Sequence, residues 1–383
     1  MIYLLVFSLS SFFLYVAEKQ INSLNKKVLT FIALLLPILL ATLRNERVGI
    51  DVETYMKPLY LCSMRSKNIG SFFANMKSEY ALMHLDYGYA LMGYFASKIT
   101  GGLWGIFLVN SLLCILPLYF GIVKYNKILK CNVNVGSKEV PIWIAMFIFY
   151  CLFYNNSLNQ VRQIITCALL FYGFMSLLRK EYIRGIFVFL VACTFHKASF
   201  IFLYIAIVYG FARSKNKNWR IILLFSLIVF LIFSIQIFYF GMNILNALGL
   251  VPEKYYGEIF NKEYGDRDVN LSWLFIALVM LVITALNLYN NRQDVMARFL
   301  FLITFSFISL FNLSSYFSSF GRIQLYFMIY ASICLPLFAT AGQSLIKESK
   351  IASNIICIIV PLLYWFVAVY LFDYTGTIPY HFI

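Results

Sequence analysis

The sequence predicts an all-α, polytopic membrane protein, and three observations support this fold class. Hydrophobic residues make up 62% of the chain and charged residues only 12%, with a mean hydropathy of +0.81. A soluble protein of 383 residues cannot bury so much apolar surface, because polar side chains must cover its exterior. Apolar runs long enough to cross about 30 Å of hydrocarbon recur along the chain, and Lys and Arg concentrate in alternate loops.

The apolar segments predict about twelve transmembrane helices. Ten runs are continuous and cover residues 2–17, 28–43, 102–123, 140–157, 161–178, 220–240, 271–289, 299–313, 323–342 and 351–371. The stretch 183–212 is too long for one span and is interrupted at residues 195–199, so it predicts two short helices. Residues 84–101 are amphipathic and predict an interfacial or re-entrant helix. The first run lacks the features of a cleaved signal peptide and is expected to be a retained helix.

The charges in the loops predict the orientation of the chain. Six loops are assigned to the cytoplasm: 18–27, 124–139, 179–184, 213–220, 290–298 and 343–350. They hold 18 of the 31 basic residues but five of the 16 acidic ones. This bias accounts for the net charge of +15 without nucleic-acid binding. Both termini are then expected outside. We predict one polytopic domain over residues 1–383, with long outer loops at 44–86 and 241–270.

The predicted spans carry no ionisable residues near their middles, apart from the interrupted stretch. Ion sites and proton relays need such residues there, so the functional surface is expected at a membrane face. Arg44 and Arg47 stand on the outer side, against the usual bias of basic residues toward the cytoplasm. Guanidinium groups match phosphate oxygens, and the nearby Gly49 permits close backbone approach. The alternative is a headgroup anchor pair with Asp51 capping the next helix.

Two further outer clusters combine a cation with hydrogen-bonding groups. Asn159, Arg162 and Gln163 follow the i, i+3, i+4 spacing of one helical face, at the start of the span near residue 161. The dipole of a helix N-terminus also favours anions, although part of this run could simply turn and cap the helix. His196 and Lys197 interrupt an apolar stretch, where a neutral histidine can accept or donate a proton. A structural role for a lone histidine is the alternative.

Two weaker clusters complete the outer surface. Asp86 and Tyr89 can offer a carboxylate and an aromatic face to a sugar, or can belong to an interfacial aromatic belt. Arg322 stands at the outer entrance of a span and can bind an anion or extend to lipid headgroups. The eight cysteines include no C-x-x-C pair, and Asp51-x-Glu53 is a weak divalent-cation site. We therefore expect neither a metal nor another cofactor.

The order of these short motifs resembles that of a known family. The motifs are Arg44 with Val48-Gly49-Ile50-Asp51 and Tyr55, Asp86-Tyr87-Gly88-Tyr89, Asn159-x-x-Arg162-Gln163, His196-Lys197-Ala198-Ser199, Arg322 with Tyr326-Phe327, and Pro379-Tyr380. Over essentially the whole chain they resemble the EpsG family of Wzy-like polysaccharide polymerases of bacterial exopolysaccharide and O-antigen loci. Asp86 and Ile50 depart from the commoner Glu and Thr of that pattern. The first change keeps a carboxylate and the second loses a hydroxyl.

The resemblance implies a GT-C-like membrane glycosyltransferase. Its reaction would transfer a polyprenyl-pyrophosphate-linked glycan to a lipid-linked repeat unit at the outer face of the bacterial plasma (inner) membrane, without a cofactor. The expected partners are the lipid-linked oligosaccharide, membrane lipid and a chain-length regulator. Arg44, Arg47, Arg162 and Arg322 are expected to bind pyrophosphate. Asp51 and His196 are the candidate bases for the acceptor hydroxyl, with Asp86 third.

Three other functions stay open from the sequence. A flippase for lipid-linked oligosaccharides would be a transporter with cations deep in a central cavity. A membrane O-acyltransferase would use His196 as base, but its donor should engage the cytoplasmic side. An O-antigen ligase would share the chemistry and the membrane face of the polymerase and would differ mainly in its acceptor.

Overall fold

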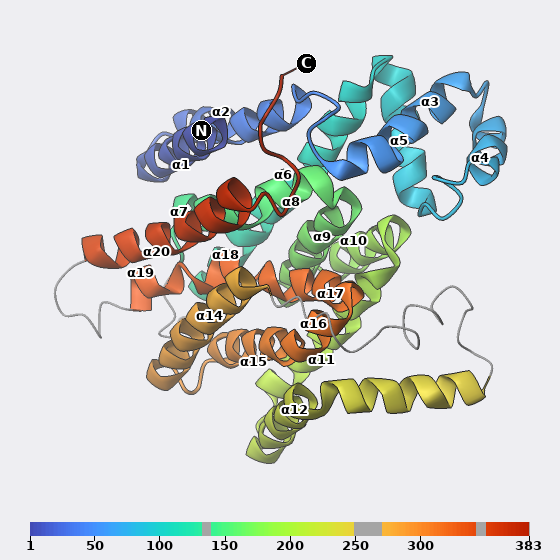
Figure 1. Ribbon diagram of the computed structural model, residues 1–383. Helices are drawn as coiled ribbons and strands as arrows, with labels where there is room; N and C mark the ends of the chain where they lie inside the picture. The colour runs from blue at the N-terminus through green and yellow to red at the C-terminus, as the bar shows by residue number, and fades with distance from the viewer. Residues whose placement is uncertain (132–138, 249–269, 342–349, 383) are drawn as a thin grey trace. The chain divides into compact units, whose positions relative to one another are not determined.

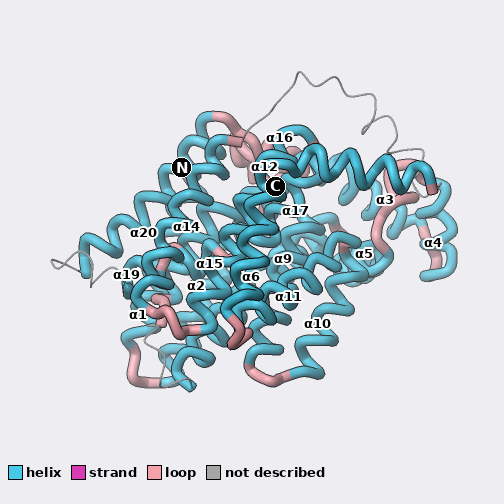
Figure 2. The backbone as a smooth tube through the Cα atoms, turned by 90° about the horizontal axis from the view of Figure 1, so that it is seen from below, coloured by secondary structure: helices cyan, strands magenta, loops and turns pink. Residues whose placement is uncertain are grey.

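The computed structural model of this protein describes residues 1–131, 139–248, 270–341 and 350–382. Helix is the dominant structure of these residues, and their one β contact is an isolated bridge. Figure 2 shows helices joined by short loops in the described chain. The predicted all-α fold class is therefore confirmed.

The described chain divides into two compact units. The first comprises Met1–Leu203 and Ile329–Ile383, and the second comprises Tyr204–Met328. The α-helices of the first unit are α1 (Ile2–Lys19), α2 (Ser23–Thr42), α3 (Lys57–Arg65), α4 (Ile69–Ser78), α5 (Tyr87–Thr100), α6 (Leu103–Cys131), α7 (Ile142–Phe149), α8 (Asn155–Asn159), α9 (Val161–Leu178), α10 (Tyr182–Phe195), α18 (Ala331–Cys334), α19 (Leu337–Ala341) and α20 (Lys350–Tyr364). α11 (Ile201–Arg213) crosses the boundary between the units. The second unit continues with α12 (Lys217–Ala247), α14 (Leu271–Asn290), α15 (Val295–Ser309), α16 (Phe311–Tyr316) and α17 (Ser318–Met328).

Nine helical segments in the described residues are long and apolar enough to cross a membrane. They correspond to nine of the twelve predicted spans, which makes the chain a polytopic membrane protein. The tenth continuous run is helical over residues 142–159, but its middle is the π-helical segment Tyr150–Tyr154 between α7 and α8. The interrupted stretch forms the short helices α10 and α11, separated by the 3-10 turn Lys197–Phe200. The span count therefore depends on these three shorter segments.

The predicted outer loop 44–86 is largely helical. A π-helical turn, Val52–Met56, leads directly into α3, and α4 follows after a capping box at Asn68. Of the second predicted loop, 241–270, the first residues belong to the end of α12, and residues 249–269 lie outside the described chain. Residues 84–101 form the helix α5, as the amphipathic pattern predicts, although the structure contains no membrane that would test its interfacial position.

The C-terminal segment holds the beginning of loop 44–86 in place. Arg44 forms a β bridge with Phe382, and the amide of Asn45 donates to the carbonyl of His381 at 2.8 Å. Thr377 anchors the same segment to the helices, because the Tyr3 hydroxyl donates to its carbonyl at 3.0 Å. Figure 1 shows this tail, in red, running beside the end of α2. Backbone pairing thus fixes residues 44–49 against the helices of the first unit.

Candidate functional site

Arg44 is buried just beyond the end of α2. Its side chain is 1% exposed and donates from Nη1 to the carbonyl of Leu158 at 2.9 Å. The guanidinium carbon lies 4.4 Å from the centre of the Phe107 ring, and Nη2 contacts the sulfur of Met56 at 3.7 Å. None of the salt bridges among the described residues involves Arg44, and its Nε has no hydrogen-bond partner there. A buried cation without a carboxylate partner leaves a positive potential at this point.

Gly49 brings loop 44–86 against the polar break before α9. Its φ is +96°, in the left-handed region that favours glycine, and its amide donates to the carbonyl of Gly376 at 3.1 Å. A Cβ at this position would lie 2.4 Å from the carbonyl oxygen of Leu158. Only glycine fits both the backbone angle and this contact.

Gly49→Ala is expected to destabilise the protein by about 1–3 kcal/mol, because it combines an unfavourable backbone angle with a clash against backbone. The lower melting temperature of the purified protein in detergent would show it. Gly321→Ala is the matched control, since a Cβ there meets nothing within 4 Å. Equal stability of the two variants would contradict the assigned role of Gly49.

Arg162 lies at the start of α9, where two residues that are distant in sequence contact its side chain. Its Nη1 donates to Oδ2 of Asp86 at 3.1 Å, and its guanidinium carbon lies 4.9 Å from the centre of the Tyr55 ring. The two charged side chains are 20% and 11% exposed, respectively. No side chain caps this helix and no acidic residue lies in its first turn. The helix dipole and the guanidinium therefore add their positive potentials at one place.

The expected common helical face of Asn159, Arg162 and Gln163 is wrong. α8 ends at Asn159, Gln160 takes a non-helical conformation (φ −90°, ψ 55°), and α9 begins at Val161. The break turns Asn159 toward loop 44–86, where its side-chain oxygen accepts from the amide of Asp51 at 3.3 Å. Gln163 is buried at 4% exposure. The helix start near residue 161 is confirmed, whereas the i, i+3, i+4 geometry is lost at the break.

Asp51 begins the π-helical turn Val52–Met56 but makes no side-chain capping hydrogen bond. Asp51 therefore occupies the N-cap position, as the alternative expected, but its side chain does not cap the turn. The half-buried carboxylate interacts electrostatically with the hydroxyl of Tyr89. Because π-helical turns are frequent at functional sites, this turn marks Asp51 and Tyr55 as candidate site residues.

Tyr89 interacts electrostatically with Asp51, Arg162 and Arg44. Burial raises the pKa of Tyr89 to about 12, with donation from Asn110 and the cations Arg162 and Arg44 acting in the opposite direction. Nδ2 of Asn110 lies 3.2 Å from the Tyr89 hydroxyl and 3.7 Å from the sulfur of Met56. The phenol is therefore a neutral hydrogen-bonding group surrounded by ionised ones.

The turn that carries His196 and Lys197 follows α10, whose end packs closely against α5. A Cβ on Gly88 would lie 2.1 Å from the hydroxyl of Thr194, so glycine permits this approach. Burial raises the pKa of the Asp86 carboxyl, while Arg162 and Lys197 act to lower it. Lys197 is exposed, and Nδ1 of His196 accepts from the amide of Ala198 at 3.2 Å, which caps the 3-10 turn.

The first unit thus brings together most of the site residues that the sequence predicts, namely Arg44, Asp51, Asp86, Tyr89, Asn159, Arg162, His196 and Lys197. Arg47 is exposed, and its amide donates to the side chain of Asn45 at 3.1 Å. Arg322 is an exposed residue of α17 in the second unit. Among the described residues, no group of three or more His, Cys, Asp and Glu could hold a metal ion.

Three residues of this site carried no role in the sequence analysis. Phe107 and Asn110 of α6 and Met56 of the π-helical turn contact Arg44 or Tyr89. Asn110 has a signal in the sequence, because it is a polar residue within the apolar run 102–123. Phe107 and Met56 have none, since apolar residues are ordinary in such segments.

The fold and this site define a class: an all-α polytopic membrane protein with a cluster of ionised residues where loop 44–86, the start of α9 and the end of α10 meet. The EpsG family model matches residues 27–382. The chain therefore belongs to the EpsG family and is a polysaccharide polymerase-like membrane protein. Comparisons with curated proteins and with solved structures find no match.

Proposed function

We propose that this protein is a glycosyltransferase that polymerises oligosaccharide repeat units. The donor is a growing glycan linked to polyprenyl pyrophosphate, and the acceptor is the sugar of a lipid-linked repeat unit. The reaction takes place at the outer face of the bacterial plasma membrane, and a chain-length regulator is a further partner. Membership of the EpsG family and the arrangement of charges around Tyr89 support the proposal.

The observation that carries the proposal is that Arg44 and Asn110 contact the same Met56 sulfur, at 3.7 Å each, while Asn110 also binds the Tyr89 hydroxyl. Arg44 and Arg162 both act electrostatically on that hydroxyl. Arg44 has no carboxylate partner among the described residues, and Arg162 has one, Asp86. Their potential is reinforced by the uncapped start of α9. Such a site favours an anion whose charge increases during the reaction. The pyrophosphate leaving group of a lipid-linked sugar has this property.

The reaction breaks the bond between the anomeric carbon and the phosphate oxygen, and it forms a bond from that carbon to the acceptor oxygen. The bonding electrons leave with the polyprenyl pyrophosphate, and the acceptor hydroxyl loses its proton to a base. Arg162 contacts the departing pyrophosphate in this proposal, with Lys197 beside it. Arg44 does not contact the pyrophosphate in this proposal, because its guanidinium already contacts the carbonyl of Leu158 and the ring of Phe107. It stabilises the pyrophosphate through its positive charge.

Asp51 is the base in this proposal, in preference to His196. Nδ1 of His196 accepts a backbone hydrogen bond, so the neutral ring carries its proton on Nε2. That nitrogen can donate a hydrogen bond but cannot remove a proton. Asp86 is engaged with Arg162 at 3.1 Å. Asp51 is acceptor-only when ionised, and it stands at the start of the π-helical turn, where it interacts electrostatically with Tyr89. We therefore assign His196 and Asp86 to positioning.

The deciding experiment is polymerisation of purified lipid-linked repeat units by the purified protein. Formation of a ladder of lipid-linked glycans is the expected result. A flippase would move the substrate between leaflets without lengthening it, and an acyltransferase would leave chain length unchanged. A ligase would attach the glycan to a different acceptor. Any of these outcomes in place of a ladder would overturn the proposal.

Polymerisation is expected to persist in EDTA, because guanidinium groups supply the positive charge that the leaving group requires. The glycan ladder is measured with and without the chelator, and with Mg²⁺ or Mn²⁺ restored afterwards. Activity that EDTA abolishes and either cation restores would contradict the metal-free scheme.

A further inference from the structure

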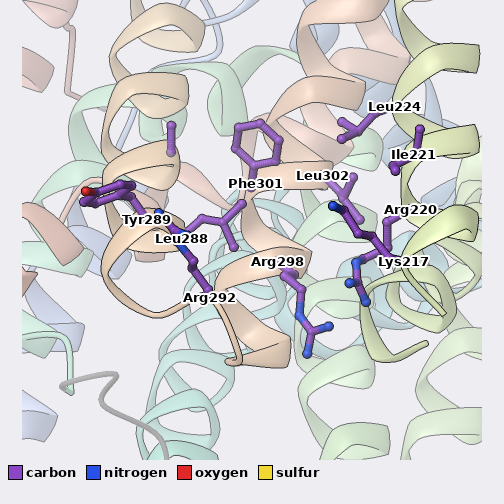
Figure 3. Close-up of a pocket in the computed structure, with 11 residues that line it drawn as sticks. Lys217, Arg220, Ile221, Leu224, Leu288, Tyr289, Arg292, Arg298, Phe301 and Leu302 are labelled. Atoms are coloured by element: carbon purple, nitrogen blue, oxygen red, sulfur yellow. The ribbon is translucent and has the colours of Figure 1, made fainter. Parts of the chain in front are cut away.

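The second unit contains a pocket with a volume of about 480 Å³ that belongs to none of the sites described above. α12 and α15 begin at this pocket and α14 ends there. Its lining includes four cationic residues: Lys217, Arg220, Arg292 and Arg298. Most of the other lining residues are apolar, including Phe301 and Leu302. Figure 3 shows Arg298 between Arg292 on one side and Arg220 with Lys217 on the other.

Three of the four cations, the arginines, are held in place without a salt bridge in the described chain. None of the salt bridges among the described residues involves them. Arg298 donates from Nη2 to the carbonyl of Gln293 at 3.0 Å, and Arg220 donates to the carbonyl of Ser214. Arg292 lies over the ring of Tyr289, with its guanidinium carbon 4.9 Å from the ring centre. Backbone carbonyls and an aromatic ring, which carry no net charge, therefore orient the guanidinium groups.

The helix geometry strengthens the positive potential. Lys217 opens α12 and Arg298 lies near the start of α15, where the helix dipole repels cations. Asp294 is the nearby acid. It caps α15 by accepting from the amide of Met296 at 2.8 Å, and it interacts electrostatically with Arg298. One carboxylate against four cations leaves a net charge of +3 at the pocket, which calls for an anionic ligand.

We propose that this pocket binds the phosphate headgroup of an anionic phospholipid from the leaflet that borders residues 213–220 and 290–298. The phosphodiester lies among the guanidinium groups, and the first part of the lipid chains lies against Phe301 and Leu302. The charge requires an anion and the apolar lining requires an amphiphile, which together exclude free phosphate and zwitterionic lipid as the preferred ligand. This site is independent of the proposed glycosyltransferase site in the first unit.

The test uses the full-length protein in neutral detergent, with phosphatidylglycerol as the probe and native mass spectrometry as the readout. Arg220→Gln combined with Arg298→Gln is expected to weaken phosphatidylglycerol binding about tenfold or more. Arg213→Gln combined with Lys215→Gln is the matched control, because it removes two cations that lie at and after the end of α11, just before α12, and do not line the pocket. Equal weakening by both pairs would reduce the effect to general surface charge and overturn the proposal.

A second variant tests the shape of the pocket while keeping every cation. Ala285 lines the pocket on α14, and Ala285→Trp is expected to fill it and abolish phosphatidylglycerol binding. Unchanged binding would overturn the proposal. If this variant does not fold, the paired cation variants still decide.

Ligand competition identifies the source of the anion. Inorganic phosphate and phosphatidylcholine are expected to leave bound phosphatidylglycerol in place. Displacement of phosphatidylglycerol by inorganic phosphate would show that the lipid chains contribute nothing to binding, and it would overturn the proposal. Stronger binding of a polyprenyl phosphate than of phosphatidylglycerol would overturn the assignment of the ligand as a phospholipid. Glycan polymerisation by the Arg220→Gln and Arg298→Gln pair is expected to match the parent protein, so failure of one proposal is distinguishable from failure of the other.

Discussion

Arg162→Ala is expected to lower the rate of glycan polymerisation by about 10²–10³-fold, because it removes a preorganised cation from the departing pyrophosphate. The rate is measured on purified lipid-linked repeat units under saturating substrate. Arg162→Lys retains the charge but loses the planar fork and the contact with the ring of Tyr55, so we expect it to recover only part of the activity.

Arg65→Ala is the control for this prediction. Arg65 is an exposed residue at the end of α3 in the same unit, and none of the salt bridges among the described residues involves it. Its replacement should leave polymerisation unchanged. If Arg65→Ala and Arg162→Ala were equally active, Arg162 would have no special role in the reaction.

The pairing of Arg162 with Asp86 allows a further measurement on the same variants. Asp86→Asn should reduce the rate because it frees the guanidinium from its 3.1 Å contact. In a double-mutant cycle, Asp86→Asn should have little additional effect once Arg162 is replaced. Additive losses would mean that Asp86 acts separately from Arg162. Asp86 would then take the role of base that we assign to Asp51.

Asp51→Asn is expected to lower the rate of polymerisation by about 10²–10⁴-fold, the usual contribution of a general base. The substitution keeps the size of the side chain and the amide that donates to Asn159. The loss should therefore appear in the catalytic rate, while binding of the lipid-linked donor stays within a few-fold of the parent protein.

Glu53→Gln is the matched control for Asp51→Asn. Glu53 is an acid in the same π-helical turn, two residues further on, and its side chain is exposed. Full activity of this variant is expected. His196→Gln should have an intermediate effect, because His196 caps the turn beside the site in our assignment. A larger loss in His196→Gln than in Asp51→Asn would exchange the roles of the two residues.

The helical content of the chain could be predicted from the sequence because it depends on local composition. A run of about 20 apolar residues must satisfy its backbone hydrogen bonds internally when it lies in a membrane, and a helix does this within the run. The predicted runs are accordingly mostly helical where the structure describes them, although turns divide the run 323–342 into α17, α18 and α19. Of the three segments that fall below the criterion for a span, one contains the π-helical Tyr150–Tyr154, and the other two, α10 and α11, lie on either side of the turn Lys197–Phe200. Polar residues follow the π-helical segment, and polar residues form part of the turn.

The membership of the site was only partly predictable. The arginines and acids that follow apolar runs, together with the polar run 155–163, stand out in the sequence because their chemistry is unusual beside apolar spans. Phe107 and Met56 do not, since nothing distinguishes a ring or thioether that supports Arg44 from one that packs against lipid. The sequence left open a turn within the polar run 155–163 but did not place it at Gln160, and this break decides where Asn159 and Arg162 point.

The sequence by itself determined the all-α membrane fold and the types of residue available for chemistry. Only the tertiary structure decided how those residues are used. Arg44 and Arg47 are three positions apart and chemically identical, yet one is buried against Phe107 and the other is exposed. Arg162 is paired with Asp86, 76 residues away. The physical reason is that burial and ion pairing depend on which distant segments meet, whereas helix formation in a membrane depends on neighbouring residues alone.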